Sequence, residues 1–162
     1  MSEKPMSSEE LEQSYANATI NDDAAPEDSA ELPPELQQFV AKLFNLARNG
    51  GPDAAEHLVQ YVEAGLSPNL TNHEGNSLLM LAAYNGHADI VTALAKVGAD
   101  VDRLNDRGQS PLAGAIFKKE TAVVEALIDA GANPLAGHPD AIACADMFGQ
   151  TELAERLRAL AG

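Results

Sequence analysis

The side chains that could hold a metal ion or act as nucleophiles are four histidines and one cysteine in a chain of 162 residues. Zinc is held by histidine nitrogen and cysteine sulfur, and two such ligands on one helix stand three or four residues apart. No pair with this spacing occurs among His57, His73, His87, His138 and Cys144. The sequence therefore predicts no metal site.

Cys144 and a distant histidine could form a nucleophile and base pair, which is the chemistry of cysteine hydrolases. The residues around Cys144 do not resemble the signatures of such enzymes, and cysteine is commonly a buried small apolar residue. A Gly-rich phosphate-binding loop of the required form is absent as well. We therefore expect a protein that is not an enzyme and carries no cofactor.

Acidic residues are concentrated at the start of the chain. Residues 1–34 hold nine acidic residues and one basic residue, Lys4, which gives a net charge of −8 out of −15 for the whole chain. A segment with this charge and few large apolar side chains cannot bury enough surface to offset the entropy lost on ordering. We expect residues 1–34 to be a disordered acidic tail and residues 35–162 to form the folded domain. The tail is either a solubilising segment or a flexible arm that reaches a basic surface.

The charge also limits the class of partner. A net charge of −15 and an isoelectric point near 4.4 would repel nucleic acid and anionic membranes. The sequence has no apolar run long enough to span a membrane, and no apolar segment follows Lys4 as in a secretory signal. A single cysteine is compatible with a reducing compartment. We expect a cytoplasmic monomer whose partner is another protein, neutral or basic, and neither nucleic acid nor membrane.

Two stretches of the chain repeat each other at a distance of 33 residues. Residues 72–104 and 105–137 agree at glycine, serine, leucine, alanine and valine positions. The matched positions include Gly75 and Gly108, Ser77 and Ser110, Ala82 and Ala115, Leu94 and Leu127, and Gly98 and Gly131. A fixed period of about 20–50 residues is the signature of a stack of repeated structural units.

Several of the matched residues have a mechanical role in a pair of helices. Ser77 and Ser110 are suited to cap the first helix of a unit, and Pro111 suits its first turn because the missing N–H has no partner there. Apolar residues then recur at helical spacing in the second helix. Gly98 and Gly131 end that helix because glycine adopts left-handed backbone geometry without strain.

The flanking units follow the same pattern less regularly. The first contains about three extra residues near 51–53, and the last lacks three residues in the turn near 138–140. Atypical end units are expected because an end unit has a neighbour on one side only. We therefore predict four units, over residues 35–71, 72–104, 105–137 and 138–162.

The pattern resembles that of the ankyrin repeat family, in which a turn is followed by Thr-Pro-Leu-His, a short helix, Gly-His, a second helix and Gly-Ala-Asp. The matching residues are Ser110, Pro111 and Leu112, then Gly86 and His87, and then Gly98, Ala99 and Asp100. The resemblance implies an all-α ankyrin-repeat solenoid of about four helix-turn-helix units with projecting hairpin loops. It also assigns His87 a structural role.

In ankyrin folds, the two positions before the Gly-His glycine lie at the end of the first helix and face the concave groove where partners usually dock. As candidate partner-binding residues at these positions we take Arg48, Tyr84, Asn85, Phe117, Lys118 and Met147. We expect Tyr84, Phe117 and Met147 to form an apolar line with Arg48 at one end, because such side chains are typical anchors of protein interfaces. The alternative is that Phe117 folds back onto its own repeat, since Lys119 and Glu120 replace the glycine and histidine there.

The hairpin tips are the second contact surface of the family. In this chain they carry His73, Glu74 and Asn76 in one unit and Asp106, Arg107 and Gln109 in the next. Their mixed charge indicates no particular partner, and a solvated loop explains these residues equally well.

The resulting hypothesis is a non-catalytic adaptor or regulator that binds a partner protein through its groove and its hairpin tips. The alternative is an acidic chaperone or inhibitor that shields a basic client protein, whose affinity would fall steeply with salt. An enzyme is disfavoured because a repeat stack offers no obvious deep pocket.

Overall fold

The computed structural model of the chain describes residues 34–162. Over this range the chain forms eight α-helices, and its β-structure is limited to one isolated bridge between Thr71 and Ser77. The predicted all-α repeat fold is confirmed. The predicted disorder of residues 1–34 lies outside the described residues except for Pro34, which begins the first described helix.

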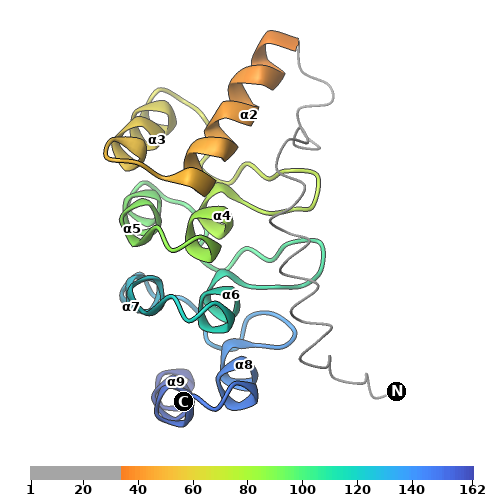
Figure 1. Cartoon of the computed structure of the whole chain (residues 1–162), viewed down its shortest axis with the longest axis vertical. Coiled ribbons are helices and arrows are strands. Elements are labelled where there is room, and N and C mark those ends of the chain that lie inside the picture. Colours follow the sequence, from red (N-terminus) through yellow and green to blue (C-terminus); the bar gives the residue numbers. More distant parts are fainter. Residues whose placement is uncertain (1–33) are drawn as a thin grey trace.

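The helices form two columns (Figure 1). The inner column consists of α2 (Pro34–Asn49), α4 (Leu78–Tyr84), α6 (Pro111–Phe117) and α8 (Ala141–Met147). The outer column consists of α3 (Ala54–Glu63), α5 (Ala88–Lys96), α7 (Thr121–Asp129) and α9 (Thr151–Ala161). Each inner helix leads into an outer helix, and hairpin loops then pass back beyond the inner column to start the next unit. We call these loops, residues 66–76, 99–109 and 132–139, the hairpins.

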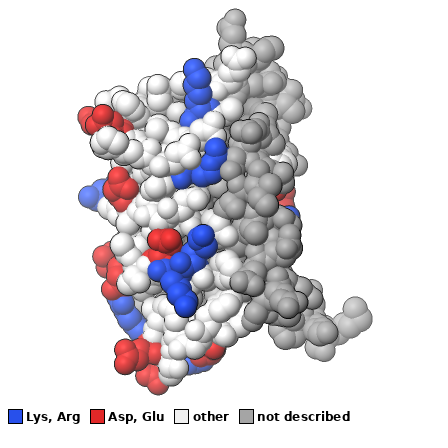
Figure 2. Space-filling model, viewed as in Figure 1, with Lys and Arg blue, Asp and Glu red and all other residues white. Residues whose placement is uncertain are grey.

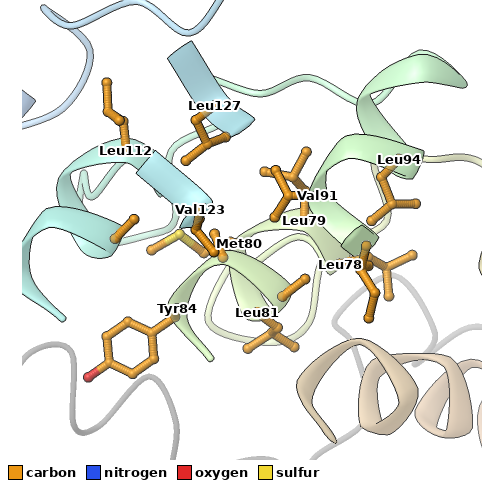
Figure 3. Close-up of a cluster of buried hydrophobic side chains, with 14 of the residues drawn as sticks. Leu78, Leu79, Met80, Leu81, Tyr84, Val91, Leu94, Leu112, Val123 and Leu127 are labelled. Carbon is orange, nitrogen blue, oxygen red and sulfur yellow. The ribbon is translucent and has the colours of Figure 1, made fainter. Parts of the chain in front are cut away.

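The hydrophobic core runs continuously through the stack. All seven residues of α4 are buried, because α2 and α6 cover it from two sides and α5 packs against it. Figure 3 shows Leu79 and Met80 of this helix together with Val91 of α5 and with Val123 and Leu127 of the next unit. Burying one such side chain stabilises the fold by about 1.5–3 kcal/mol, so neighbouring units depend on each other.

The predicted helix starts are present. The Ser77 hydroxyl accepts a hydrogen bond from the Met80 N–H at 3.0 Å, and the Ser110 hydroxyl accepts one from the Ala113 N–H at 3.1 Å. Asp140 caps α8 in the same way, accepting from the Ala143 N–H at 2.8 Å, although its unit is irregular in sequence. These caps fix the register at which three inner helices begin.

The two end helices differ from those inside the stack. The first, α2, has 16 residues, more than twice the seven of α4, and three exposed residues at 51–53 lie in the turn that follows it. In α9, the buried residues are Ala154 and Leu157 alone. Its arginines form ion pairs on the surface, Arg156 with Glu125 of α7 and Arg158 with Asp146 of α8. The last helix thus presents a polar face to solvent.

In every unit, the same position of the turn between the inner and the outer helix has left-handed backbone geometry. Gly50, Gly86 and Gly149 occupy this position with φ angles of 70°, 82° and 73°. In the third unit the position is held by Lys119, with φ of 58°. A residue with a side chain loses roughly 1–2 kcal/mol in this geometry. The third unit therefore carries a strained residue where the other units have glycine.

Replacing Lys119 by glycine is expected to raise the free energy of unfolding by about 0.5–1 kcal/mol, because the relieved strain exceeds the added entropy of the unfolded chain. Urea unfolding followed by circular dichroism measures this change. The matched control Lys119→Ala keeps the strained geometry and should bring no gain. A less stable Lys119→Gly variant would show that contacts of the lysine side chain outweigh the strain.

Candidate functional site

The candidate residues of the inner column lie where the inner helices end. Tyr84, Phe117 and Met147 are the last residues of α4, α6 and α8, and Arg48 is the penultimate residue of α2. Because α2, α4, α6 and α8 pack side by side in this order, the four helix ends follow one another along the stack (Figure 1). We call Arg48, Tyr84, Asn85, Phe117, Lys118 and Met147 the helix-end row.

Tyr84 is the most buried aromatic residue of the helix-end row, with 6% of its surface exposed. Its ring points away from Leu79 and Val91 in the core (Figure 3). The ammonium group of Lys118 lies 5.0 Å from the centre of the Tyr84 ring, which is a cation–π contact between neighbouring units. Loss of hydration raises the pKa of the Tyr84 phenol to about 12, so this hydroxyl stays protonated at neutral pH.

Phe117 packs against the next unit. Its ring meets that of Phe148 edge to face, with the ring centres 5.4 Å apart. Both rings and Met147 are half-buried, so each keeps surface for a further contact. Phe148 follows Met147 at the position that Asn85 and Lys118 hold in their units. The sequence thus places Phe148 among the groove-facing positions, although it is not one of the candidate partner-binding residues named from the sequence.

Two polar residues of the helix-end row, Arg48 and Asn85, each form a hydrogen bond to their own helix. The Asn85 side-chain amide donates to the Leu81 carbonyl at 2.8 Å, and the Arg48 guanidinium donates to Asn45 Oδ1 at 2.6 Å. His87 Nε2 lies 2.7 Å from the Arg48 carbonyl oxygen and thereby ties the second unit to the end of α2. This contact agrees with the structural role that the resemblance implied for His87.

The predicted hairpin-tip residues fall into two groups. Asn76 and Gln109 are buried, with 0% and 1% of their surfaces exposed. The Asn105 side-chain amide joins them, donating to Asn76 Oδ1 at 2.9 Å and to Gln109 Oε1 at 2.6 Å. These two residues therefore hold neighbouring hairpins together.

The other four tip residues lie nearer the surface. His73 and Glu74 are half-buried, and Asp106 and Arg107 are exposed. The Asp106 N–H donates to the Glu74 carbonyl at 3.0 Å, so the two tips are linked through their backbones as well. Of the predicted tip residues, these four have side chains that a partner could contact.

Charge is distributed unevenly over the two columns. Figure 2 shows blue side chains gathered over the inner column, whereas the red ones lie mainly toward the outer column. Of the four inner helices, α4 and α6 contain no acidic residue, and α2 and α8 contain one each, Glu35 and Asp146. The outer helices carry seven acidic residues, which are Glu56, Glu63, Asp89, Glu125, Asp129, Glu152 and Glu155. The inner side therefore departs from the strongly acidic character of the whole chain.

Residues 34–162 bring no three histidine, cysteine, aspartate or glutamate side chains together as metal ligands. None of the helices in this range combines the length and apolar character that a membrane span requires. An open depression of about 760 Å³ lies between α5 and α7, lined mainly by alanines and by charged side chains of the outer column. It lies away from the helix-end row.

Cys144 is fully buried in α8 and donates its S–H to the Ala113 carbonyl, with sulfur and oxygen 3.3 Å apart. Loss of hydration, with a smaller contribution from the negative charge of Asp140, raises the pKa of this thiol to about 12. A thiol needs its deprotonated form to act as a nucleophile. The structure thus supports the interpretation of Cys144 as a core residue.

Alkylation of Cys144 by iodoacetamide at pH 8 should therefore be at least about 100-fold slower in the native protein than in urea, because the raised pKa keeps the thiol protonated and burial shields it. Mass spectrometry of quenched samples follows the reaction. Native and unfolded rates within a few-fold of each other would contradict this account of Cys144.

Replacing Asn105 by alanine should lower the free energy of unfolding by about 1–3 kcal/mol, because it removes the amide that joins the buried Asn76 and Gln109 side chains. Asp106→Ala is the matched control on the exposed neighbouring position and should change stability by no more than about 0.5 kcal/mol. Urea unfolding measures both. Equal effects of the two substitutions would show that the buried hydrogen bonds between hairpins contribute little.

Comparison with known proteins agrees with this architecture. A family model described as ankyrin repeats, in three copies, matches residues 43–137, which is more than half of the chain. The chain is also similar to a protein of Pseudomonas aeruginosa that is named as an ankyrin repeat protein. The two are 57% identical over 61 residues, and this alignment covers 38% of the chain and about a third, 34%, of that relative. The paired helices, glycine turns and projecting hairpins, together with the family match, show that this protein belongs to the ankyrin repeat family.

Proposed function

We propose that this protein is a non-catalytic adaptor or regulator that docks a partner protein on its inner side, through the helix-end row and the exposed residues of the hairpin tips. Ankyrin repeats are generally protein–protein interaction modules, and the family is typically non-catalytic. The finer proposal, that this chain uses the helix-end row, is supported by one arrangement in particular. Phe117, Phe148 and Met147 form a half-buried apolar cluster that spans two units, with the exposed Lys118 beside it.

This cluster has the composition of an interface anchor. Aromatic and methionine side chains supply a large apolar area at a modest cost in side-chain entropy, and a polar rim excludes water around them. Phe117 and Phe148 already contact each other, so little ordering is needed when a partner binds. The row also sits on helix ends that the stack holds rigidly, which favours a preformed binding surface.

The double substitution Phe117→Ala and Met147→Ala should reduce partner binding about ten-fold, because it removes most of the apolar surface of the cluster. The partner is the protein that the wild-type chain captures from a lysate of the source cells, and its recovery is titrated against bait concentration. Leu160→Ala, which truncates an exposed leucine at the end of α9, is the matched control and should leave recovery unchanged. Helix content is checked by circular dichroism.

Unchanged recovery with a folded double variant would exclude the helix-end row as the docking surface. The alternative function, an acidic chaperone or inhibitor of a basic client, predicts this outcome together with recovery that falls steeply with salt. The acidic residues of the outer helices are the described groups that would attract such a client. The two functions therefore differ in which face is used and in their response to salt.

A further inference from the structure

The inner side of the stack carries a row of cations. Lys42 and Arg48 belong to α2, and Lys118 and Lys119 form the turn after α6. Two acidic residues lie close to these four cations. Asp146 of α8 pairs with Arg158, whereas Glu120, which directly follows Lys119 and packs against Gly86, sets one negative charge against the four positive ones. The row is thus a basic strip within a chain of net charge −15.

The backbone geometry of Lys119 is independent support for a role of this strip other than stabilising the fold. This residue holds the left-handed turn position that glycine holds in the other three units, and there its side chain costs stability. Strained residues of this kind tend to occur where function requires the side chain. Lys119 adds a second positive charge next to Lys118, directly after the helix end that carries Phe117.

From the charge complementarity we infer that the strip binds the acidic residues 1–33 of the same chain. This segment holds nine acidic residues and one basic residue, and it joins the described structure at Pro34, the first residue of the helix that carries Lys42 and Arg48. An extended chain of this length reaches up to about 110 Å. The four inner helices, spaced about 8–10 Å apart, span about 30 Å, so every cation of the strip is within reach.

The covalent tether makes this contact feasible although exposed ion pairs are individually weak. A tethered ligand has an effective concentration of about a millimolar, and several carboxylates meet four cations at once. The contact needs no external partner and does not depend on the function proposed above. If that function holds, residues 1–33 would compete with the partner for the helix-end row, and the chain would regulate its own binding.

Zero-length carbodiimide coupling of carboxylates to lysines in the full chain tests the inference. Amide cross-links from residues 1–33 should reach Lys42, Lys118 and Lys119 at least about five-fold more often than Lys96, an exposed lysine of the outer helix α5. They should fall several-fold between about 10 mM and 1 M salt, which shortens the Debye length from about 30 Å to about 3 Å. Peptide mass spectrometry identifies and counts them.

A mixture of unlabelled and ¹⁵N-labelled protein distinguishes contacts within one chain from contacts between copies. Cross-links that join light to heavy peptides would assign the strip to a second copy and overturn the inference. So would cross-links that reach Lys96 as often as the strip, or yields that salt does not change. Absence of cross-links between residues 1–33 and the strip would also overturn the inference.

A pair of variants controls for lysine reactivity. Lys118→Gln with Lys119→Gln should lower the cross-links that remain at Lys42 several-fold, because fewer cations then hold the segment, whereas Lys96→Gln should not change them. Equal effects of the two changes would contradict a shared strip. If these results hold while Phe117→Ala with Met147→Ala leaves partner recovery unchanged, the contact stands and the proposed function fails. If the cross-linking results fail while the double variant loses partner recovery, the contact is excluded and the proposed function stands.

Discussion

The structure depends on one constraint, which is that a pair of short helices cannot bury its own apolar residues. Seven residues make two turns, and in α4 all seven are buried, which requires neighbours on several sides. The stack provides them, with α2 and α6 on either side and α5 behind. At the ends the same constraint has a different solution. The first inner helix is longer, and the last outer helix buries Ala154 and Leu157 while most of its other residues face water.

The constraint also determines where a binding site can lie. Residues in the middle of the inner helices are committed to the core, so on the inner side of the stack the side chains left for other contacts are those at helix ends and hairpin tips. Even there, part of the surface is committed. Asn76 and Gln109 hold the hairpins together through Asn105, and Asn85 bonds to its own helix. The docking surface proposed for this side is the half-buried cluster of Phe117, Met147 and Phe148 with the charged groups around it.

Much of the fold could be predicted because the stacking constraint applies to every unit, so residues of the same type recur every 33 positions in the sequence. Ser77 and Ser110 begin their helices as expected, and the family model confirms the repeat type. Burial of individual polar residues was harder to predict, because Asn76 depends on Asn105 of the following hairpin, 29 residues away. The direction of the Phe117 ring was open for the same reason, since Phe148, its partner, belongs to the next unit.

The net charge of the chain describes the inner side poorly, and the reason is the range of electrostatic forces. At physiological salt the Debye length is about 8 Å, which is shorter than the width of a helix pair. A ligand on the inner side is therefore subject mainly to Lys118, Lys119, Arg48 and their neighbours, and little to the carboxylates of the outer helices. Composition averages both faces and predicts a neutral or basic partner. The inner side by itself attracts acidic groups, and an acidic segment tethered to α2 needs no long-range attraction to find it.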